Sequence, residues 1–394
     1  MNIGMILEKK FPPDIRVEKE ADALIKTGHQ VHLLAIRTNG QLIEETINGI
    51  QIHRYIPYEK CSFWRKVKNI IFIITHFSPR WTQQIQVMIK EYNLDVLHVH
   101  DLPLVGVALR AASSQEIPVI VDLHETYPEA VKVMGPKVRV IDFLGNWKQC
   151  EKKWLKMCHH IIVVIDEAKE RLIEADFSAD KITVVSNMTN IDFFNTLIPD
   201  QNLAKKYKNN FVILYTGGFN LNRGLDVAIK AMKEVVRQIP EAKLLLVGRQ
   251  KDALGLDNLI NRLSLNDNVE LIDWQESAKM MNYILLSHVC LVPHRKNPFT
   301  DTTIPHKLFH YMLAKKPVIV SDCVPLGRIV DETNAGLIFK NSDSRDLAEK
   351  IIQIYKNPDS YGKNGYQAVI DKYNWENDGA KLIKLYQHIE QQLS

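Results

Sequence analysis

Short apolar segments alternate with longer amphipathic segments along nearly the whole chain. The first half contains five segments with the character of buried strands: Asn2–Leu7, Val31–Ala35, Val96–His100, Val119–Leu123 and Ile161–Val164. Between the first two, apolar residues recur at helical spacing over Val17–Thr27, and Gly28 stands where a helix-terminating glycine belongs. Continuous apolar strands alternating with helices are typical of parallel sheets covered on both faces. The alternation therefore predicts an α/β protein.

The alternation pauses at Asn187–Asn210, a polar segment that contains Pro199 and ends in the basic run KKYKNN, and we interpret it as a linker. A second series follows, with strands expected at Phe211–Tyr215, Lys243–Val247, Val289–Val292 and Val318–Val320 and helices at Leu225–Gln238, Leu256–Leu263 and Lys307–Ala314. The prediction is two Rossmann-like, doubly wound domains, residues 1–195 and 196–375, followed by an amphipathic helix at 376–394. Because such sheets bind ligands beyond the carboxyl ends of their strands, two facing domains imply a central cleft.

Composition excludes several classes of protein. Apolar residues make up 46% and charged residues 24% of the 394, which is ordinary for a globular protein. The net charge of +4 gives no reason to expect a nucleic-acid partner. No apolar run approaches the roughly 18 residues that suggest a membrane span, and the first residues lack the features of a signal peptide. The five cysteines form no CxxC pair, so we expect reduced thiols in a cytoplasmic protein.

The segment YTGGFNLNRGLDVAIKAM, Tyr215–Met232, is the strongest chemical signal. A strand ends, Gly217 and Gly218 follow, and a helix begins near Gly224 with Arg223 directly before it. Glycines allow backbone amides to approach a ligand, and a helix N-terminus attracts negative charge. The segment therefore predicts a diphosphate site, although it matches neither GxGxxG nor a P-loop. The alternative is a glycine turn with a surface arginine.

The segment HRKNPFTDTTIPHKLFHYMLAKKPVIVSD, His294–Asp322, is the second signal. A strand ends before it, a polar loop follows, and a helix begins near Lys307, so this loop lies at a carboxyl end of the same sheet. Backbone amides, the hydroxyls of Thr302 and Thr303, and the Lys307 ammonium would add to the anion site. The alternative for Lys307 is a solvated lysine at the start of a helix.

With these segments the chain resembles the retaining glycosyltransferases of the GT-B fold, in particular the large family-4 group. The resemblance also includes FPPDIRVEKEADALIKTGHQVHLL, DVLHVHD and VIVDLHETYPE in the first half and YNWENDGAKLIKLYQHIEQQL at the end. It implies two Rossmann-like domains and a final helix that crosses back to the first. It also implies transfer of a sugar from a nucleoside-diphosphate sugar with retention at the anomeric carbon. That donor is a co-substrate, and neither a cofactor nor a metal is expected.

The resemblance implies roles for individual residues. Arg223 matches a basic residue that contacts the donor diphosphate, Lys307 matches the lysine of a PNKLFEY-like motif, and His124 matches a histidine lining the sugar site. The catalytic residue is thus expected to be His124, with an open alternative of a strand-end histidine bonded to a backbone carbonyl. The donor-binding set is Gly217, Gly218, Arg223, His294, Thr303, Ile304, Lys307 and His310.

Three positions depart from the family pattern. Thr302 and His310 stand where the family places two glutamates, and Phe219 stands where an arginine is common. A neutral imidazole accepts one hydrogen bond, whereas a carboxylate accepts two or more. His98, His100 and Asp101 share the pattern of a metal site, but the family segment explains them as a strand end near the cleft, so no metal is expected.

The stretch Lys60–Trp81 interleaves basic residues with aromatic and aliphatic ones. Such a mixture suits the surface of an anionic membrane. The alternative is that Ile70–Ile74 pack into the first domain and the lysines are solvated, and both possibilities stay open.

The expected function is a cytoplasmic glycosyltransferase that builds a cell-surface polysaccharide or a lipid-linked glycan, with a contact at the inner face of the membrane as one of the two open possibilities for Lys60–Trp81. Its partners are a nucleotide-sugar donor and a glycan or lipid-linked acceptor. Two alternatives remain: a nucleotide-sugar epimerase of the same fold, and a nucleotide-sugar-binding protein without catalysis, which the departure at His310 suggests.

Overall fold

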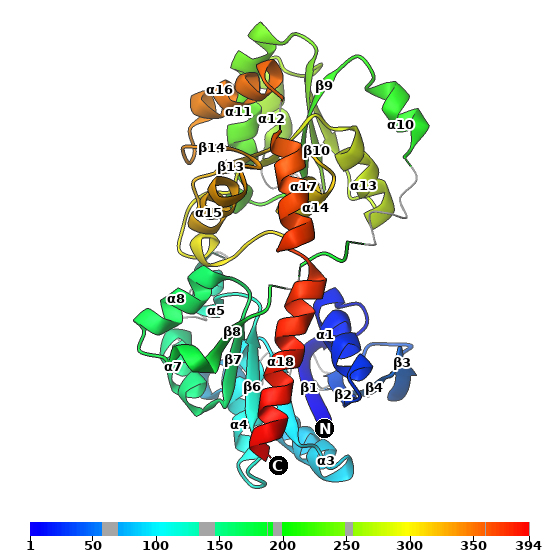
Figure 1. Ribbon diagram of the computed structural model, residues 1–394, viewed down its shortest axis with the longest axis vertical. Coiled ribbons are helices and arrows are strands. Elements are labelled where there is room, and N and C mark those ends of the chain that lie inside the picture. Colours follow the sequence, from blue (N-terminus) through cyan, green and yellow to red (C-terminus); the bar gives the residue numbers. More distant parts are fainter. Residues whose placement is uncertain are drawn as a thin grey trace. The chain divides into compact units, whose positions relative to one another are not determined.

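The computed structural model describes residues 1–56, 70–133, 146–186, 188–191, 199–248, 255–358 and 360–393. Its backbone divides into two units (Figure 1): unit 1 is Met1–Asn187 with Asp378–Ser394, and unit 2 is Met188–Asn377. Each unit is built on a parallel sheet, so the expected pair of doubly wound α/β domains is confirmed. The chain passes from one unit to the other after residues 187 and 377, whereas the sequence analysis put the domain boundaries after residues 195 and 375.

The sheet of unit 1 has the strand order β3-β4-β2-β1-β5-β6-β7-β8. Its strands are β1 (Asn2–Lys10), β2 (Gln30–Ile36), β3 (Glu44–Ile47), β4 (Ile50–Tyr55), β5 (Val96–His100), β6 (Val119–Leu123), β7 (His160–Val163) and β8 (Ile182–Val184). All described pairs are parallel except β3 with β4, a hairpin that the sequence analysis did not predict. The strand order reverses at β1, which lies between β2 and β5.

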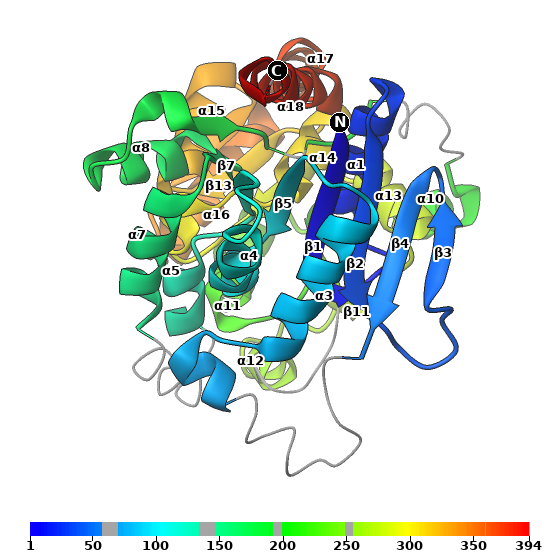
Figure 2. The same cartoon turned by 90° about the horizontal axis from the view of Figure 1, so that it is seen from below.

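The helices of unit 1 cover both faces of this sheet. They are α1 (Ile15–Lys26), α3 (Pro79–Glu91), α4 (Val105–Ala112), α5 (Tyr127–Val133), α7 (Trp147–Met157), α8 (Asp166–Glu174) and most of α18 (Trp375–Leu393). Helix α1 begins where the Asp14 carboxylate accepts a hydrogen bond from the Arg16 amide, and its buried face includes Val17, Ala21 and Leu24. Helices α1 and α18 lie on one face of the sheet and α3 and α4 on the other (Figure 2).

The sheet of unit 2 is parallel throughout its described strands, in the order β11-β10-β9-β12-β13-β14. The strands are β9 (Phe211–Thr216), β10 (Ala242–Val247), β11 (Val269–Ile272), β12 (Val289–Val292), β13 (Val318–Ser321) and β14 (Gly336–Phe339). The sequence analysis missed β11 and β14. The strand order reverses at β9, between β10 and β12, and such a point is where open α/β sheets bind ligands.

The helices of unit 2 are α10 (Gln201–Lys206), α11 (Leu225–Gln238), α12 (Leu256–Arg262), α13 (Ser277–Leu286), α14 (Lys307–Leu313), α15 (Val324–Thr333), α16 (Ser344–Lys356) and α17 (Tyr361–Asp371). Helices α11 and α16 contribute buried apolar side chains to one core with β9, β10 and β12. Among the helices of the described residues, none has the length and hydropathy to cross a bilayer.

Helix α10 corrects the interpretation of Asn187–Asn210 as a linker. The Asp200 carboxylate accepts hydrogen bonds from the amides of Asn202 and Leu203 and so caps this helix. The Lys206 ammonium and the Tyr207 hydroxyl then both bond to the Glu270 carboxylate at the end of the sheet. The described end of the segment is thus an integral part of unit 2.

Candidate functional site

The expected donor-binding residues follow the two strands that flank the reversal of strand order in unit 2. Gly217 and Gly218 come directly after β9, and His294 comes after β12. Lys307 begins α14, which the Tyr311 hydroxyl holds against the end of β9 by accepting a hydrogen bond from the Thr216 amide at 2.8 Å. These loops therefore meet at the carboxyl edge of the sheet.

Arg223 ends the short helix η3 (Leu221–Arg223), immediately before Gly224. Gly224 has a φ of +61°, and a Cβ there would lie 1.9 Å from the carbonyl oxygen of Pro293, so only glycine allows the two loops to approach this closely. The approach places Arg223 Nη1 2.9 Å from His294 Nε2. Two residues that are 71 positions apart in the sequence thus lie in direct contact.

Lys307 lies against the glycine turn rather than in open solvent. Its Nζ is 3.9 Å from the centroid of the Tyr215 ring, within the range of a cation–π contact. A Cβ on Gly217 would lie only 2.6 Å from that Nζ, and Gly217 has a φ of +119°. Lys307 is therefore partly enclosed by the glycine turn and is not a fully solvated lysine.

Positive charges without carboxylate partners among the described residues dominate the electrostatics of this cluster. Burial, together with the positive charge of Arg223, holds the pKa of Lys307 well below its usual value. Burial, Arg223 and Lys307 likewise hold the pKa of His294 well below its usual value. No carboxylate pairs with Arg223 or Lys307 among the ion pairs of the described residues. The basic groups therefore repel one another, and a bound anion would relieve that repulsion.

The remaining expected residues surround this cluster less directly. The Thr303 hydroxyl donates to the carbonyl oxygen of Phe299 at 3.0 Å, so only its lone pairs remain for a ligand. Ile304 is buried. His310 lies on α14 one turn after Lys307 and is half-buried. The Thr302 hydroxyl donates to the carbonyl oxygen of Pro298 at 3.0 Å.

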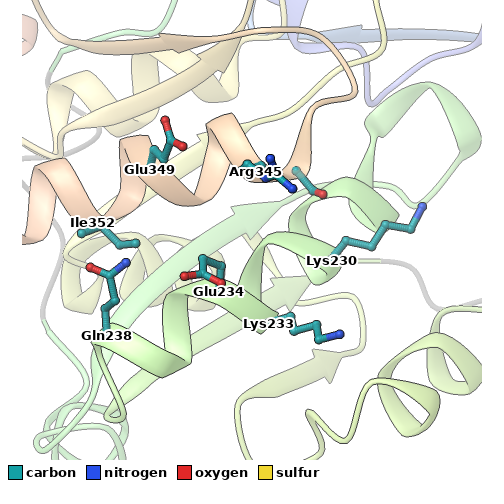
Figure 3. Close-up of a pocket in the computed structure, with 8 residues that line it drawn as sticks. Lys230, Lys233, Glu234, Gln238, Arg345, Glu349 and Ile352 are labelled. Carbon is teal, nitrogen blue, oxygen red and sulfur yellow. The ribbon is translucent and has the colours of Figure 1, made fainter.

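A pocket of about 380 Å³ lies elsewhere in unit 2, between helices α11 and α16 (Figure 3). Charges of both signs line it, among them Lys230, Lys233, Glu234, Arg345 and Glu349. The Lys230 ammonium already pairs with Asp226 at 2.9 Å. None of the expected donor-binding residues lines this pocket.

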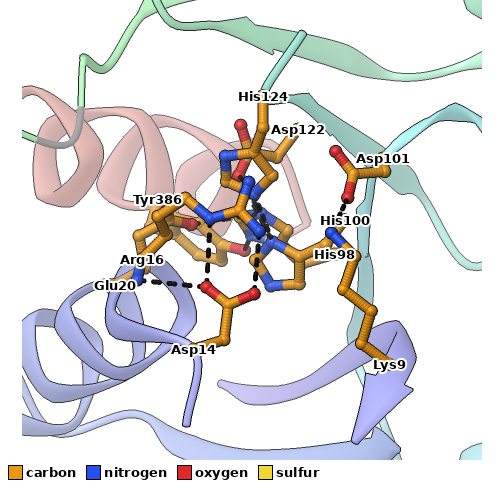
Figure 4. A network of polar contacts seen from close by, with 10 residues as sticks. All are labelled: Lys9, Asp14, Arg16, Glu20, His98, His100, Asp101, Asp122, His124 and Tyr386. Atoms are coloured by element: carbon orange, nitrogen blue, oxygen red, sulfur yellow. Dashed lines mark hydrogen bonds and ion pairs between the residues drawn. The ribbon is translucent and has the colours of Figure 1, made fainter. Parts of the chain in front are cut away.

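His124 lies just beyond β6 of unit 1, and its side chain is nearly buried (Figure 4). Its Nε2 is 2.9 Å from Oδ2 of Asp122. Burial lowers the pKa of His124, but the Asp122 charge and hydrogen bond outweigh burial and raise that pKa to about 9. His124 is therefore an imidazolium at neutral pH. Its second nitrogen, Nδ1, is buried and has no hydrogen-bond partner among the described residues.

Asp122 is the centre of a buried network of histidines. His100 Nδ1 lies 3.2 Å from its Oδ2, and His98 Nε2 lies 3.8 Å from the same oxygen. His98 Nε2 also lies 3.4 Å from Oε2 of Glu20, and the Tyr386 hydroxyl lies 2.7 Å from His98 Nδ1. Burial raises the pKa of Asp122, but the charge of His124 and the histidine hydrogen bonds outweigh burial and hold that pKa well below its usual value. Burial and the neighbouring His98 lower the pKa of His100 to about 4.

Four members of this network bring potential metal ligands within 4.8 Å of one another: Glu20, His98, His100 and Asp122. The protein's own groups use these atoms in part, because Asp122 Oδ2 pairs with His124 and His98 Nδ1 pairs with Tyr386. A cation on Asp122 would also compete with the His124 imidazolium. The four side chains thus form hydrogen bonds and ion pairs with one another, and the expected absence of a metal stays a prediction.

Further ionisable groups lie around the ends of β1, β5 and β6. Arg16 forms a 2.7 Å ion pair with Asp14, and Lys9 pairs with Asp101 at 3.3 Å. Burial and the charge of Asp101 raise the pKa of Glu8 to about 7. The same two causes raise the pKa of Glu125. This edge of unit 1 thus combines carboxyl groups with the imidazolium of His124.

Sequence reasoning predicted a role for His124 but did not predict the residues that hold its side chain. Asp122 and His124 stand two apart at a strand end and therefore point to the same side, a signal that was present in DLHE. His98 and His100 were noted only as a metal pattern. Tyr386 carries no local signal, because its contact with His98 spans 288 positions.

Comparisons with known proteins place this geometry in a family. The model "Glycosyltransferase Family 4" matches residues 15–193, and the model "Glycosyl transferases group 1" matches residues 200–369. A phosphatidyl-myo-inositol mannosyltransferase of Mycolicibacterium smegmatis is 21% identical over 401 residues, covering 99% of this chain and 94% of the relative.

Solved structures share the fold. The sucrose-phosphate synthase of Thermosynechococcus elongatus superimposes with a TM-score of 0.80 at 19% identity, covering all of both chains. Anabaena HepE in complex with UDP-glucose superimposes with a TM-score of 0.72 at 14% identity, covering 98% of this chain and 100% of HepE. With both halves matched by family models, the chain belongs to the group 1 glycosyltransferases and has the GT-B fold.

Proposed function

We propose that the protein is a retaining glycosyltransferase that moves a sugar from a nucleoside-diphosphate sugar to a glycan or lipid-linked acceptor. The observation that carries this proposal is the group of Arg223, His294 and Lys307 at the carboxyl edge of the unit 2 sheet, with no carboxylate paired to the arginine or the lysine among the described ion pairs. A diphosphate is the leaving group of such a transfer, and it fits this group in charge.

In this proposal unit 2 binds the donor. The Arg223 guanidinium and the Lys307 ammonium stabilise the charge that develops on the diphosphate as the bond to the sugar breaks. Amides of the Gly217–Gly218 turn add hydrogen bonds, because the glycines leave room for close approach. Fixed cations of this kind neutralise the negative charge of the diphosphate, as a metal ion does in other transferases. They therefore support metal-independent transfer without a cofactor.

Unit 1 supplies His124 in this proposal. Its imidazolium carries one proton on Nε2, which it donates to the Asp122 carboxylate, and the other on Nδ1, which has no partner among the described residues. A buried donor without a partner is costly, so Nδ1–H is well suited to a substrate oxygen. We assign it to orient and polarise a sugar hydroxyl.

The relatives suggest the class of donor and acceptor. A UDP-sugar donor is supported by the likeness to HepE, whose solved structure contains UDP-glucose. A lipid-linked acceptor at a membrane surface is supported by the likeness to the phosphatidyl-myo-inositol mannosyltransferase. From these two likenesses we propose a role in the synthesis of a cell-surface polysaccharide or glycolipid.

A membrane contact is part of the proposal. Residues 60–69 of the basic and aromatic stretch lie outside the described part of the chain. The described part continues with a helix at 70–75, on which Ile70, Ile71 and Ile74 are 52%, 49% and 51% exposed. Half-exposed isoleucines beside a basic segment suit an interfacial position better than packing in the core.

The donor assignment is tested with a panel of UDP-, GDP- and ADP-sugars. The cognate donor should raise the melting temperature, since a ligand that binds only the folded state stabilises it. Slow release of free sugar from that donor supports the transferase. Isomerisation of the sugar would instead indicate an epimerase, and binding without turnover would indicate a protein that has lost catalysis.

The membrane contact is tested by sedimentation with anionic vesicles of phosphatidylglycerol and with neutral vesicles of phosphatidylcholine. The wild type should sediment with the anionic vesicles only. Changing Ile70, Ile71 and Ile74 to serine should abolish sedimentation, whereas the control Val87→Ser, an equally exposed residue on α3, should not. If the wild type does not sediment with anionic vesicles, the proposed membrane contact is wrong.

A further inference from the structure

Four aromatic rings form a buried column in unit 1, running from helix α18 to the end of β6 (Figure 4). Their order is Tyr386, His98, His100 and His124. Successive ring centroids are 6.2, 4.5 and 5.5 Å apart, and successive ring planes are inclined by 12°, 29° and 10°. The column therefore connects the C-terminal helix to the expected catalytic histidine.

The first contact of the column joins the Tyr386 hydroxyl to the His98 ring. The Tyr386 hydroxyl lies 2.7 Å from His98 Nδ1. Burial and the charges of Glu20 and Asp122 raise the pKa of Tyr386 well above its usual value, so Tyr386 is a neutral phenol that has a proton to donate. When the hydroxyl donates to Nδ1, His98 carries its own proton on Nε2.

The opposite tautomer is unfavourable on electrostatic grounds. His98 Nε2 lies 3.4 Å from Glu20 Oε2 and 3.8 Å from Asp122 Oδ2, within ion-pair distance of both, and makes no hydrogen bond among the described residues. A lone pair on Nε2 would lie close to two carboxyl groups, whereas an N–H there is attracted to both. The carboxyl groups thus favour the tautomer of His98 with its proton on Nε2, and the Tyr386 hydroxyl donates to Nδ1 of that tautomer.

The carboxylate of Asp122 links His98 to His124. Its Oδ2 lies 3.8 Å from His98 Nε2, 3.2 Å from His100 Nδ1 and 2.9 Å from His124 Nε2. The position of this one oxygen determines where the His124 ring lies, because Asp122 holds His124 Nε2. Outer partners that hold a carboxylate in this way fix the ring that the carboxylate binds.

We propose that Tyr386 and His98 are positioning residues for His124, acting through Asp122, so that the C-terminal helix is part of the reaction site of unit 1. The proposal relies on the proposed function only in assigning His124 to the reaction. The groups that face the column are Glu20 from α1, Asp122 from β6, and Asp14, Arg16 and Asp101 around His124.

The first test measures the tautomer of His98 in the wild type. Nitrogen-15 NMR of the histidine rings, in the full chain between pH 6 and pH 9, should show His98 with its proton on Nε2, assigned by comparison with His98→Gln. A proton on Nδ1 would overturn the proposal. One equivalent of a bound transition metal in the purified protein would overturn it as well, since His98 Nε2 would then be a ligand.

The variant Tyr386→Phe removes only the hydroxyl. Its ring signals for both His98 and His124 should shift, while those in Tyr373→Phe should not. Tyr373 is a matched control, since it is buried and its hydroxyl bonds to Glu332, but it lies in unit 2. Unchanged His124 signals in a folded Tyr386→Phe protein contradict the proposal.

Transfer kinetics separate positioning from a merely structural role. Tyr386→Phe should lower kcat about two- to tenfold, the change that one hydrogen bond provides, with donor affinity unchanged because unit 2 binds the nucleotide. In a His98→Gln background the same change should have no effect on kcat, because a glutamine amide has no tautomer to fix. An equal loss of kcat in both backgrounds would refute the coupling.

The outcomes keep this proposal distinct from the proposed function. If no nucleotide sugar is turned over while His98 and His124 show the expected NMR behaviour, the assignment as a transferase fails and the network stands. If turnover is found and Tyr386→Phe leaves His124 and kcat unchanged, the network fails and the transferase stands.

Discussion

Replacing Asp122 with asparagine tests the charge of His124 directly. Asparagine has nearly the same shape as aspartate but carries no charge, so the variant removes the anion that holds His124 as an imidazolium. Burial alone lowers a histidine pKa, so in Asp122→Asn the pKa of His124 should fall from about 9 to below the unperturbed 6.5.

The magnitude follows from the difference between folded and unfolded pKa values. His124 has a pKa of about 9 in the folded protein against 6.5 unperturbed, and at 1.36 kcal/mol per unit this corresponds to about 3 kcal/mol. Because the folded pKa is raised, this stability is fully present below pH 6.5 and is lost as the pH rises through 9. The stability difference between wild type and variant should therefore be largest at pH 6.5 and should shrink by about 3 kcal/mol by pH 10.

The assay is urea unfolding of both proteins at pH 6.5, 8 and 10, with the free energy of unfolding extrapolated to water. His160→Gln is the matched control. His160 is also a buried histidine of the unit 1 sheet, but burial and His159 lower its pKa to about 4, so it is neutral throughout this range. Its stability difference from wild type should not change with pH. If the difference for Asp122→Asn is equally independent of pH, His124 is not held as an imidazolium.

Three further predictions concern unit 2. Gly217→Ala should weaken nucleoside-diphosphate binding at least tenfold, because a Cβ there meets Lys307 Nζ at 2.6 Å and the φ is +119°. Gly327→Ala in α15, where the nearest atom lies 3.7 Å from the added Cβ, should bind normally, and equal calorimetric affinities of the two variants would contradict the described turn. Nucleotide binding should be accompanied by proton uptake that increases from pH 7 to 9.5, because a bound diphosphate raises the lowered pKa of Lys307. Calorimetry in buffers of different ionisation enthalpy should show this uptake in the wild type but not in Lys307→Arg. If His310 faces the donor ribose, His310→Glu should tighten nucleotide binding a few-fold to about tenfold, because a carboxylate accepts more hydrogen bonds than an imidazole. The control His306→Glu, at an exposed residue, should leave the nucleotide affinity unchanged.

Strands with continuous apolar runs were predictable because burial on both faces leaves a strong local signal. Val96–His100, Val119–Leu123 and Val289–Val292 have the same bounds in the structure as in the sequence prediction. The hairpin of Glu44–Ile47 and Ile50–Tyr55 was missed, since edge strands alternate polar and apolar residues and β3 is largely exposed. Helix α10 was missed because it is six residues long and depends on its cap at Asp200.

The spatial grouping of the expected donor-binding residues was predictable where they follow a strand end in a recognisable segment, and their role stays a prediction. Gly217, Arg223 and Lys307 belong to such segments, and the contact between Arg223 and His294 follows from the meeting of two loops. The network behind His124 was not predictable, because its partners come from α1, β5, β6 and α18 and only folding brings them together.

The central claim is that Arg223 and Lys307 hold a donor diphosphate, and calorimetric titration with a nucleoside diphosphate and with the corresponding nucleoside tests it most directly. The wild type should bind the diphosphate of the cognate base far more tightly than the nucleoside. Arg223→Ala should remove about tenfold or more of this preference, the worth of one hydrogen bond to a charged group, and should leave nucleoside affinity unchanged. A folded Arg223→Ala protein that keeps the full preference for the diphosphate would contradict the account.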